Sequence, residues 1–138
     1  MLFSDIIGAT YQQNVVCKSV LSWFDKTILK EYEYDVTIEH SFLSEDSAVM
    51  YVSGELEEPR EFTIEVHQYL EGKEYVMTLI HEMIHIEDYI KGNLTERDGK
   101  RYWNGVFYES GDYDNHPWEI RANRLETIFY ELYCSTLG

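Results

Sequence analysis

Apolar residues follow two different spacings in successive parts of the chain. Across residues 10–31 they recur at every fourth position, as Val16, Val20 and Phe24 do, and this spacing predicts a helix with one apolar face. Across residues 36–42 apolar and polar residues alternate instead, which predicts a half-buried strand. A chain that changes from the first period to the second over a short link must combine helices and strands in one fold.

The same patterns assign the rest of the chain. Strands are predicted over residues 47–53 and 61–68, and their short connection predicts a hairpin. A helix is predicted over residues 72–90, ended by Gly92-Asn93. Asn104-Gly105 favours a tight turn within a small hairpin over residues 102–108, and Pro117 begins a last helix that extends to about residue 133. We therefore expect an α+β fold in which helices cover one three-stranded mixed sheet.

The size and composition of the chain indicate one ordinary folded domain over residues 1–138. Hydrophobic residues make up 44% and charged residues 27% of the 138 residues, as in globular proteins. The formal net charge is −15, and no cluster of Lys and Arg is present to bind phosphates, so a nucleic-acid partner is not expected. The negative field favours neutral or basic partners instead.

The location of the protein follows from three negative features of the sequence. No stretch approaches the roughly 20 apolar residues of a membrane span, and the N-terminus lacks the pattern of a signal peptide. The two cysteines, Cys17 and Cys134, form no C-x-x-C motif, and we interpret them as reduced thiols buried among helices. The expected location is the cytoplasm, which would be that of the host if the protein is encoded by a phage.

The predicted helix over residues 72–90 contains the motif H-E-x-x-H, as His81-Glu82-Met83-Ile84-His85. The two histidines are four residues apart, so both project from one face of the helix and can bind one zinc ion. They lie opposite the main apolar stripe, which they therefore do not fill. Glu82 lies to the flank, where it can take a proton from the water that zinc activates.

A zinc site of this kind needs a third protein ligand, and several residues are candidates. Glu119 is preferred because Pro117 places it in the first turn of the last helix. His116 is the main alternative. His40 is expected to pack in the core and His67 to lie on the solvent side of its strand. Asn123, one turn after Glu119, is a candidate to hydrogen-bond a zinc-bound histidine.

These motifs resemble those of a known family. H-E-M-I-H followed by a helix bearing E-x-x-x-N is similar to the gluzincin branch of zinc peptidases, in which a Glu from a later helix is the third ligand, usually in E-x-x-x-D. The chain looks most similar to the minimal single-domain members, called minigluzincins. The stretch P-W-E-x-x-A-N also resembles small H-E-x-x-H proteins of phages. Asn123 stands in place of the usual Asp, and residues 102–108 lengthen the segment between the ligands.

The resemblance and the motif together predict a zinc-dependent endopeptidase that acts on proteins or peptides, with Glu82 as general base. By analogy with larger zincins, the substrate would extend along a sheet edge formed by residues 47–53. A donor is also needed for the developing oxyanion, and the sequence does not choose among Tyr102, Tyr108, Tyr113, His116 and Arg121. The alternative is a non-catalytic zinc-binding or acidic interaction protein, although such a protein has no need of Glu82.

Overall fold

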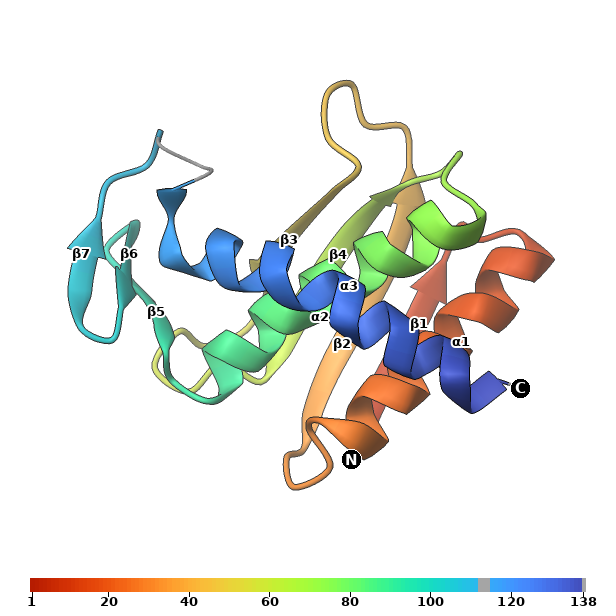
Figure 1. The fold of residues 1–138 in the computed structure, drawn as a ribbon. Coiled ribbons are helices and arrows are strands. Elements are labelled where there is room, and N and C mark those ends of the chain that lie inside the picture. The colour runs from red at the N-terminus through yellow and green to blue at the C-terminus, as the bar shows by residue number, and fades with distance from the viewer. Residues whose placement is uncertain (112–114, 138) are drawn as a thin grey trace.

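The main sheet of the protein has four strands. The computed structural model describes residues 1–111 and 115–137. Its strands are β1 (Leu2–Ile7), β2 (Tyr34–Ser41), β3 (Ala48–Val52) and β4 (Glu61–His67). Their order in space is β1-β2-β4-β3 (Figure 1). β2 pairs in parallel with both β1 and β4, whereas β3 is antiparallel to β4. The sheet is therefore mixed, as predicted, and β3 forms one of its edges.

The first strand of this sheet was not predicted from the sequence, which indicated three strands. β1 contains Ser4 and Asp5 in its middle, and its residues are exposed except for the partly buried Leu2 and Ile6. An edge strand with so little burial shows weak apolar alternation. Its parallel pairing with β2, between segments about 30 residues apart, is what makes it a strand.

Three helices lie on one side of the main sheet (Figure 1). They are α1 (Tyr11–Thr27), α2 (Gly72–Ile90) and α3 (Pro117–Leu137). The bounds of α2 agree with the prediction. α1 is shorter than residues 10–31, because Thr10 caps it from outside and the chain turns after Thr27, with Leu29 buried in the core. α3 continues to Leu137, four residues beyond the predicted end.

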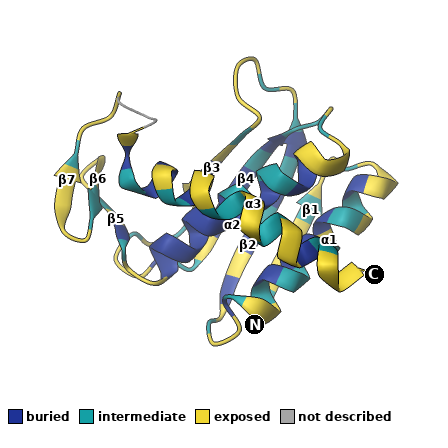
Figure 2. Ribbon diagram, viewed as in Figure 1, coloured by how far each residue is buried: buried dark blue, intermediate teal, exposed yellow. Residues whose placement is uncertain are grey.

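Packing between the helices and the sheet makes one core. The inner face of β2 and β4 buries alternate residues under α2 (Figure 2), whereas the other face carries charged and polar side chains. α2 is the most buried helix. α3 packs against α2 and contacts α1 through edge-to-face contacts of Phe129 with Trp23 and Phe24. The hydroxyl of Tyr133 donates a hydrogen bond to Ser19 Oγ at 2.8 Å.

A second, smaller sheet lies between α2 and α3 in the sequence. It consists of β5 (Leu94–Arg97), β6 (Lys100–Trp103) and β7 (Val106–Tyr108), all antiparallel. The predicted hairpin is confirmed: Asn104 and Gly105 have φ of 49° and 83°, as its turn requires. β5 was not predicted, although Asp98-Gly99, with φ of 54° and 75°, forms an equivalent turn. The α+β class is confirmed.

Two further expectations concern the thiols and membrane spans. Cys17 is buried and Cys134 is half-buried, and both are free. Within the described residues, no helix is long and apolar enough to span a membrane.

Candidate metal centre

The helix α2 carries the two histidines of the H-E-x-x-H motif on the side that faces α3. His81 and His85 are one turn apart, and their rings meet nearly at right angles with centroids 4.8 Å apart. His85 is buried, and the side chain of His81 is 14% exposed. Because α2 is held in the core along most of its length, the two rings are attached to a rigid element.

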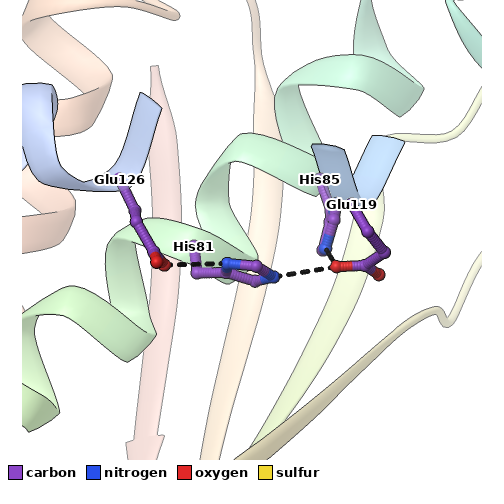
Figure 3. A network of polar contacts seen from close by, with 4 residues as sticks. All are labelled: His81, His85, Glu119 and Glu126. Carbon is purple, nitrogen blue, oxygen red and sulfur yellow. Dashed lines mark hydrogen bonds and ion pairs between the residues drawn. The ribbon is translucent and has the colours of Figure 1, made fainter. Parts of the chain in front are cut away.

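The third residue of the cluster is Glu119, in the first turn of α3. Its Oε1 lies 3.0 Å from Nε2 of His81 and 3.1 Å from Nε2 of His85 (Figure 3). Glu119 is 3% exposed. The three ligand atoms all lie within 4.8 Å of one another, so this group could hold a metal ion. The structure thus brings together the three residues that the sequence indicated as ligands.

A fourth residue, Glu126, contacts the cluster from the next turns of α3. Its Oε2 lies 2.9 Å from Nδ1 of His81, on the side of the ring away from Glu119 (Figure 3). The sequence assigned this kind of contact to Asn123, but Asn123 is exposed and its side chain has no hydrogen bond with a described residue. Glu126 is seven residues from Glu119, and two helical turns place both on one face. That spacing was the available signal for it.

The charges in the cluster favour an ion pair when no metal is bound. Burial acts to lower the pKa of His81, but hydrogen bonding to Glu119 and Glu126 raises it to about 10. Burial acts to raise the pKa of Glu119, but its contacts with His81 and His85 lower it to about 2. The carboxylate is therefore anionic, and His81 keeps a proton on each nitrogen. Loss of the Nε2 proton leaves Nε2 free as a ligand while Nδ1–H still donates to Glu126.

The side chain of Glu82, the second residue of the motif, has no hydrogen bond with any described residue although Glu82 is only 7% exposed. Burial raises its pKa, and the nearby charges of His85 and His81 oppose this rise. Its side chain lines two adjoining cavities of about 600 and 310 Å³, which also share Asp46 and Ala48. A buried, unpaired carboxylate with a raised pKa at the wall of a cavity is suited to accept a proton.

A group of buried charges lies next to the cluster and joins α2 to α3. Arg121 contacts Glu87 Oε1 at 2.9 Å and Asp88 Oδ1 at 2.7 Å. Glu87 also contacts Lys91 at 2.8 Å. Glu87 is 4% and Asp88 0% exposed. These ion pairs explain why Glu87, a charged residue, lies in the apolar stripe of α2. They also hold α3 against α2 at Arg121, which is two residues after Glu119 in the sequence.

The remaining histidines lie outside the cluster. His116 is stacked on Trp118, and its Nε2 donates to the carbonyl of Glu109 at 2.7 Å, so the structure does not favour it as third ligand. His40 packs in the core between the carbonyl of Ile7 and the hydroxyl of Tyr75. His67 is half-buried at the end of β4. The expectations for His40 and His67 are consistent with these positions.

The structure also narrows the candidates for an oxyanion donor. Tyr113 lies outside the described residues. Tyr102 and Tyr108 pack in the small sheet and against Trp118, and neither lines a cavity with Glu82. Arg121 is engaged by Glu87 and Asp88. Arg101 does line the 310 Å³ cavity with Glu82, and no sequence pattern singled it out.

Comparisons of the chain with protein-family models, with curated proteins and with solved structures found no match.

Proposed function

We propose that this protein is a zinc-dependent peptidase whose metal site consists of His81, His85 and Glu119. The observation that carries the proposal is the convergence of two imidazole nitrogens on one carboxylate oxygen beside Glu82. A site built only to stabilise the fold would have no use for a buried carboxylate that faces a cavity and has no hydrogen bond to the described residues.

The three ligand atoms suit zinc in type, and all of them lie within 4.8 Å of one another. Two imidazole nitrogens and one carboxylate oxygen are a common ligand set for catalytic zinc, and the fourth position stays open. Bonds of 2.0–2.1 Å in a tetrahedron separate neighbouring ligand atoms by about 3.4 Å. The contacts of 3.0 and 3.1 Å to Glu119 Oε1 need only a small outward adjustment to reach that separation.

A zinc ion held by His81, His85 and Glu119 would polarise a scissile carbonyl and make water a stronger nucleophile at neutral pH. Glu82 accepts the proton that the attacking water loses and delivers it to the leaving nitrogen. Burial supports this role, because it raises the pKa of Glu82 above that of an exposed carboxyl. Glu126 keeps His81 in one orientation and one tautomer.

The edge strand β3 supports a peptide substrate. Among the described strands β3 pairs with β4 alone, so its other edge carries no strand of the described chain. Ala48 lines both cavities beside Glu82. An extended peptide that pairs with this edge would pass the catalytic residues with its backbone held by hydrogen bonds. This arrangement also supports placing the protein among the minimal gluzincins.

A metal and activity measurement on matched variants tests the proposal. We expect about one zinc per chain in the purified protein, its loss in the His81→Ala and His85→Ala variants, and zinc-dependent hydrolysis of casein or of a peptide library. Glu82→Gln should keep the zinc and the fold while hydrolysis falls by roughly 10²-fold or more. Glu33→Gln, at an exposed position far from the cluster in the sequence, is the control.

Two results would refute parts of this proposal. Full zinc occupancy in the His81→Ala/His85→Ala double variant would refute the metal site. Zinc binding without hydrolysis of any peptide would favour the alternative, a non-catalytic zinc-binding protein that uses its acidic surface to bind a partner.

A further inference from the structure

The smaller of the two cavities beside Glu82 has an unusual charge pattern. Five elements wall it: β3, α2, β5, β6 and the start of α3. Its lining includes the carboxylates of Asp46, Glu82 and Glu119. Among the described residues that line it, Arg101 is the one Lys or Arg. The chain has a net charge of −15, yet one guanidinium lines the cavity that also contains Glu82 and Glu119.

The small sheet holds Arg101 in this position. Arg101 lies on β6 directly across from Glu96 on β5, and its Nε is 3.6 Å from Glu96 Oε1. The hydroxyl of Tyr89, near the end of α2, donates to the same Glu96 oxygen at 3.2 Å. The guanidinium is therefore linked through Glu96 to the helix that carries His81 and His85. The long Glu96 contact leaves N–H groups of Arg101 available to a ligand.

Arg101 and Glu82 lie on the wall of the same cavity, which has a volume of about 310 Å³. A small substrate group bound in this cavity could therefore contact both side chains.

Peptide hydrolysis is faster when a positive group or a hydrogen-bond donor lies where the carbonyl oxygen becomes negative. When the water oxygen bonds to the carbonyl carbon, the π electrons move to the carbonyl oxygen, which becomes negative, and Glu82 takes the proton. When the C–N bond breaks, those electrons return to the carbonyl, and the nitrogen leaves with its bonding pair and the proton from Glu82. Hydrogen-bond donors that are already in position stabilise the negative oxygen more than the neutral carbonyl.

We propose that Arg101 is a catalytic residue that stabilises the negative charge on the carbonyl oxygen in the transition state. This inference rests on the proposed peptidase function. It also gives the small sheet of β5, β6 and β7 a role in catalysis, because β6 positions Arg101 at the wall of the cavity. A planar guanidinium suits the role because it stays charged and offers several fixed N–H donors.

Kinetics of Arg101 variants, compared with Arg97 variants, test the proposal. Arg97 is an exposed cation of the same sheet that lies over the Tyr102 ring and does not line the cavity. With zinc bound, we expect Arg101→Gln to lower kcat by about 10²–10³-fold, the usual effect of losing an oxyanion donor, with KM changed only a few-fold. Arg101→Lys should recover part of the loss. Arg97→Gln should match the unmodified protein.

A binding measurement gives a second readout that does not depend on turnover. A phosphonamidate peptide carries a tetrahedral anion in place of the scissile carbonyl, and Arg101→Gln should weaken its binding by about the same factor as kcat/KM falls. In the inactive Glu82→Gln background, binding of the uncleaved parent peptide should change little when Arg101 is replaced. Zinc content and melting temperature should stay the same in every Arg101 variant.

Three outcomes would overturn the assignment. Unchanged kcat in Arg101→Gln would remove Arg101 from catalysis and leave the peptidase proposal intact. A rise in KM confined to substrates with an acidic residue would make Arg101 a specificity residue instead. Absence of zinc-dependent hydrolysis by the unmodified protein would overturn the peptidase proposal, and the role of Arg101 with it.

Discussion

At the scale of single residues, the contact of Glu126 with His81 tells most about how the candidate metal ligands are held in place. A metal-binding imidazole needs its other nitrogen held by an acceptor, because that contact sets both the tautomer and the orientation of the ring. Glu126 Oε2 is 2.9 Å from Nδ1 of His81, on the opposite side of the ring from Glu119. Glu126 gives His81 this second contact and is not itself one of the three candidate ligands.

We predict that Glu126→Ala weakens zinc binding by about 10–100-fold, the usual effect of losing such a partner. Glu126→Gln should lose less, because an amide oxygen still accepts the Nδ1 proton. Asn123→Ala, a change on the same helix at an exposed position, should leave the zinc affinity unaltered. Competition with a zinc chelator measures all three, and equal losses in the Asn123 and Glu126 variants would contradict the assignment.

The two thiols should differ sharply in reactivity. Cys17 is 0% exposed, and burial raises the pKa of its thiol to about 12. Because the thiolate is the reactive form, only about one molecule in 10⁴ is reactive at pH 8. We predict that a thiol reagent modifies Cys134 in the native protein and both cysteines in urea. Cys134→Ser should abolish the native reaction, and rapid labelling that persists in this variant would show that Cys17 is accessible.

At the scale of elements, the position of α3 on α2 decides whether Glu119 meets the two histidines. Arg121 contributes to this position through its contacts with Glu87 and Asp88. Burial raises the pKa of Asp88 to about 6 even though Arg121 opposes the rise. Both carboxylates are almost fully buried. Glu87 also contacts Lys91, whereas Arg121 is the one ion-pair partner of Asp88 among the described residues.

Replacing Arg121 should therefore loosen the junction between α2 and α3. We predict that Arg121→Met lowers the free energy of unfolding by about 3 kcal/mol, because it leaves buried charge without its partner. Arg124→Met, an exposed neighbour on α3, should change it by less than about 0.5 kcal/mol. Urea unfolding of the metal-free proteins measures both values.

A second variant separates lost pairing from lost packing. In Arg121→Met/Asp88→Asn the buried charge at residue 88 is removed as well, and part of the stability should return. If the double variant is less stable than Arg121→Met alone, the ion pair is not the cause.

At the scale of the whole molecule, the candidate centre joins two helices that are far apart in the sequence. Ligands on both α2 and α3 mean that a bound ion stabilises the folded state and has no complete site in the unfolded chain. Removal of the metal should therefore lower the free energy of unfolding of the whole domain.

We predict that a chelator lowers the melting temperature by about 10 °C when free zinc is otherwise about 100 times its Kd. Such binding is worth about 2.7 kcal/mol, and each kcal/mol corresponds to about 3–5 °C for a domain of this size. The His81→Ala/His85→Ala double variant should melt at the same temperature with and without chelator. An equal chelator effect on both proteins would show that zinc stabilises the fold at another place.

The sequence by itself determined the elements whose evidence is local. Residues 72–90 carry a helical apolar stripe, so the extent of α2 and the common face of His81 and His85 follow from spacing along one helix. The Asn104-Gly105 turn and the start of α3 at Pro117 follow from the preferences of adjacent residues. Glu119 was the preferred third ligand because it comes at that helix start.

Only the tertiary structure decided the features that depend on contacts between distant segments. β1 has little apolar pattern and becomes a strand through its pairing with β2. The rotation of α3 on α2 brings Glu126, and not Asn123, to His81. Arg101 reaches the cavity of Glu82 because the small sheet packs near the end of α2. Packing sets these distances, whereas spacing within one element, such as the seven residues from Glu119 to Glu126, indicates only that two side chains share a face.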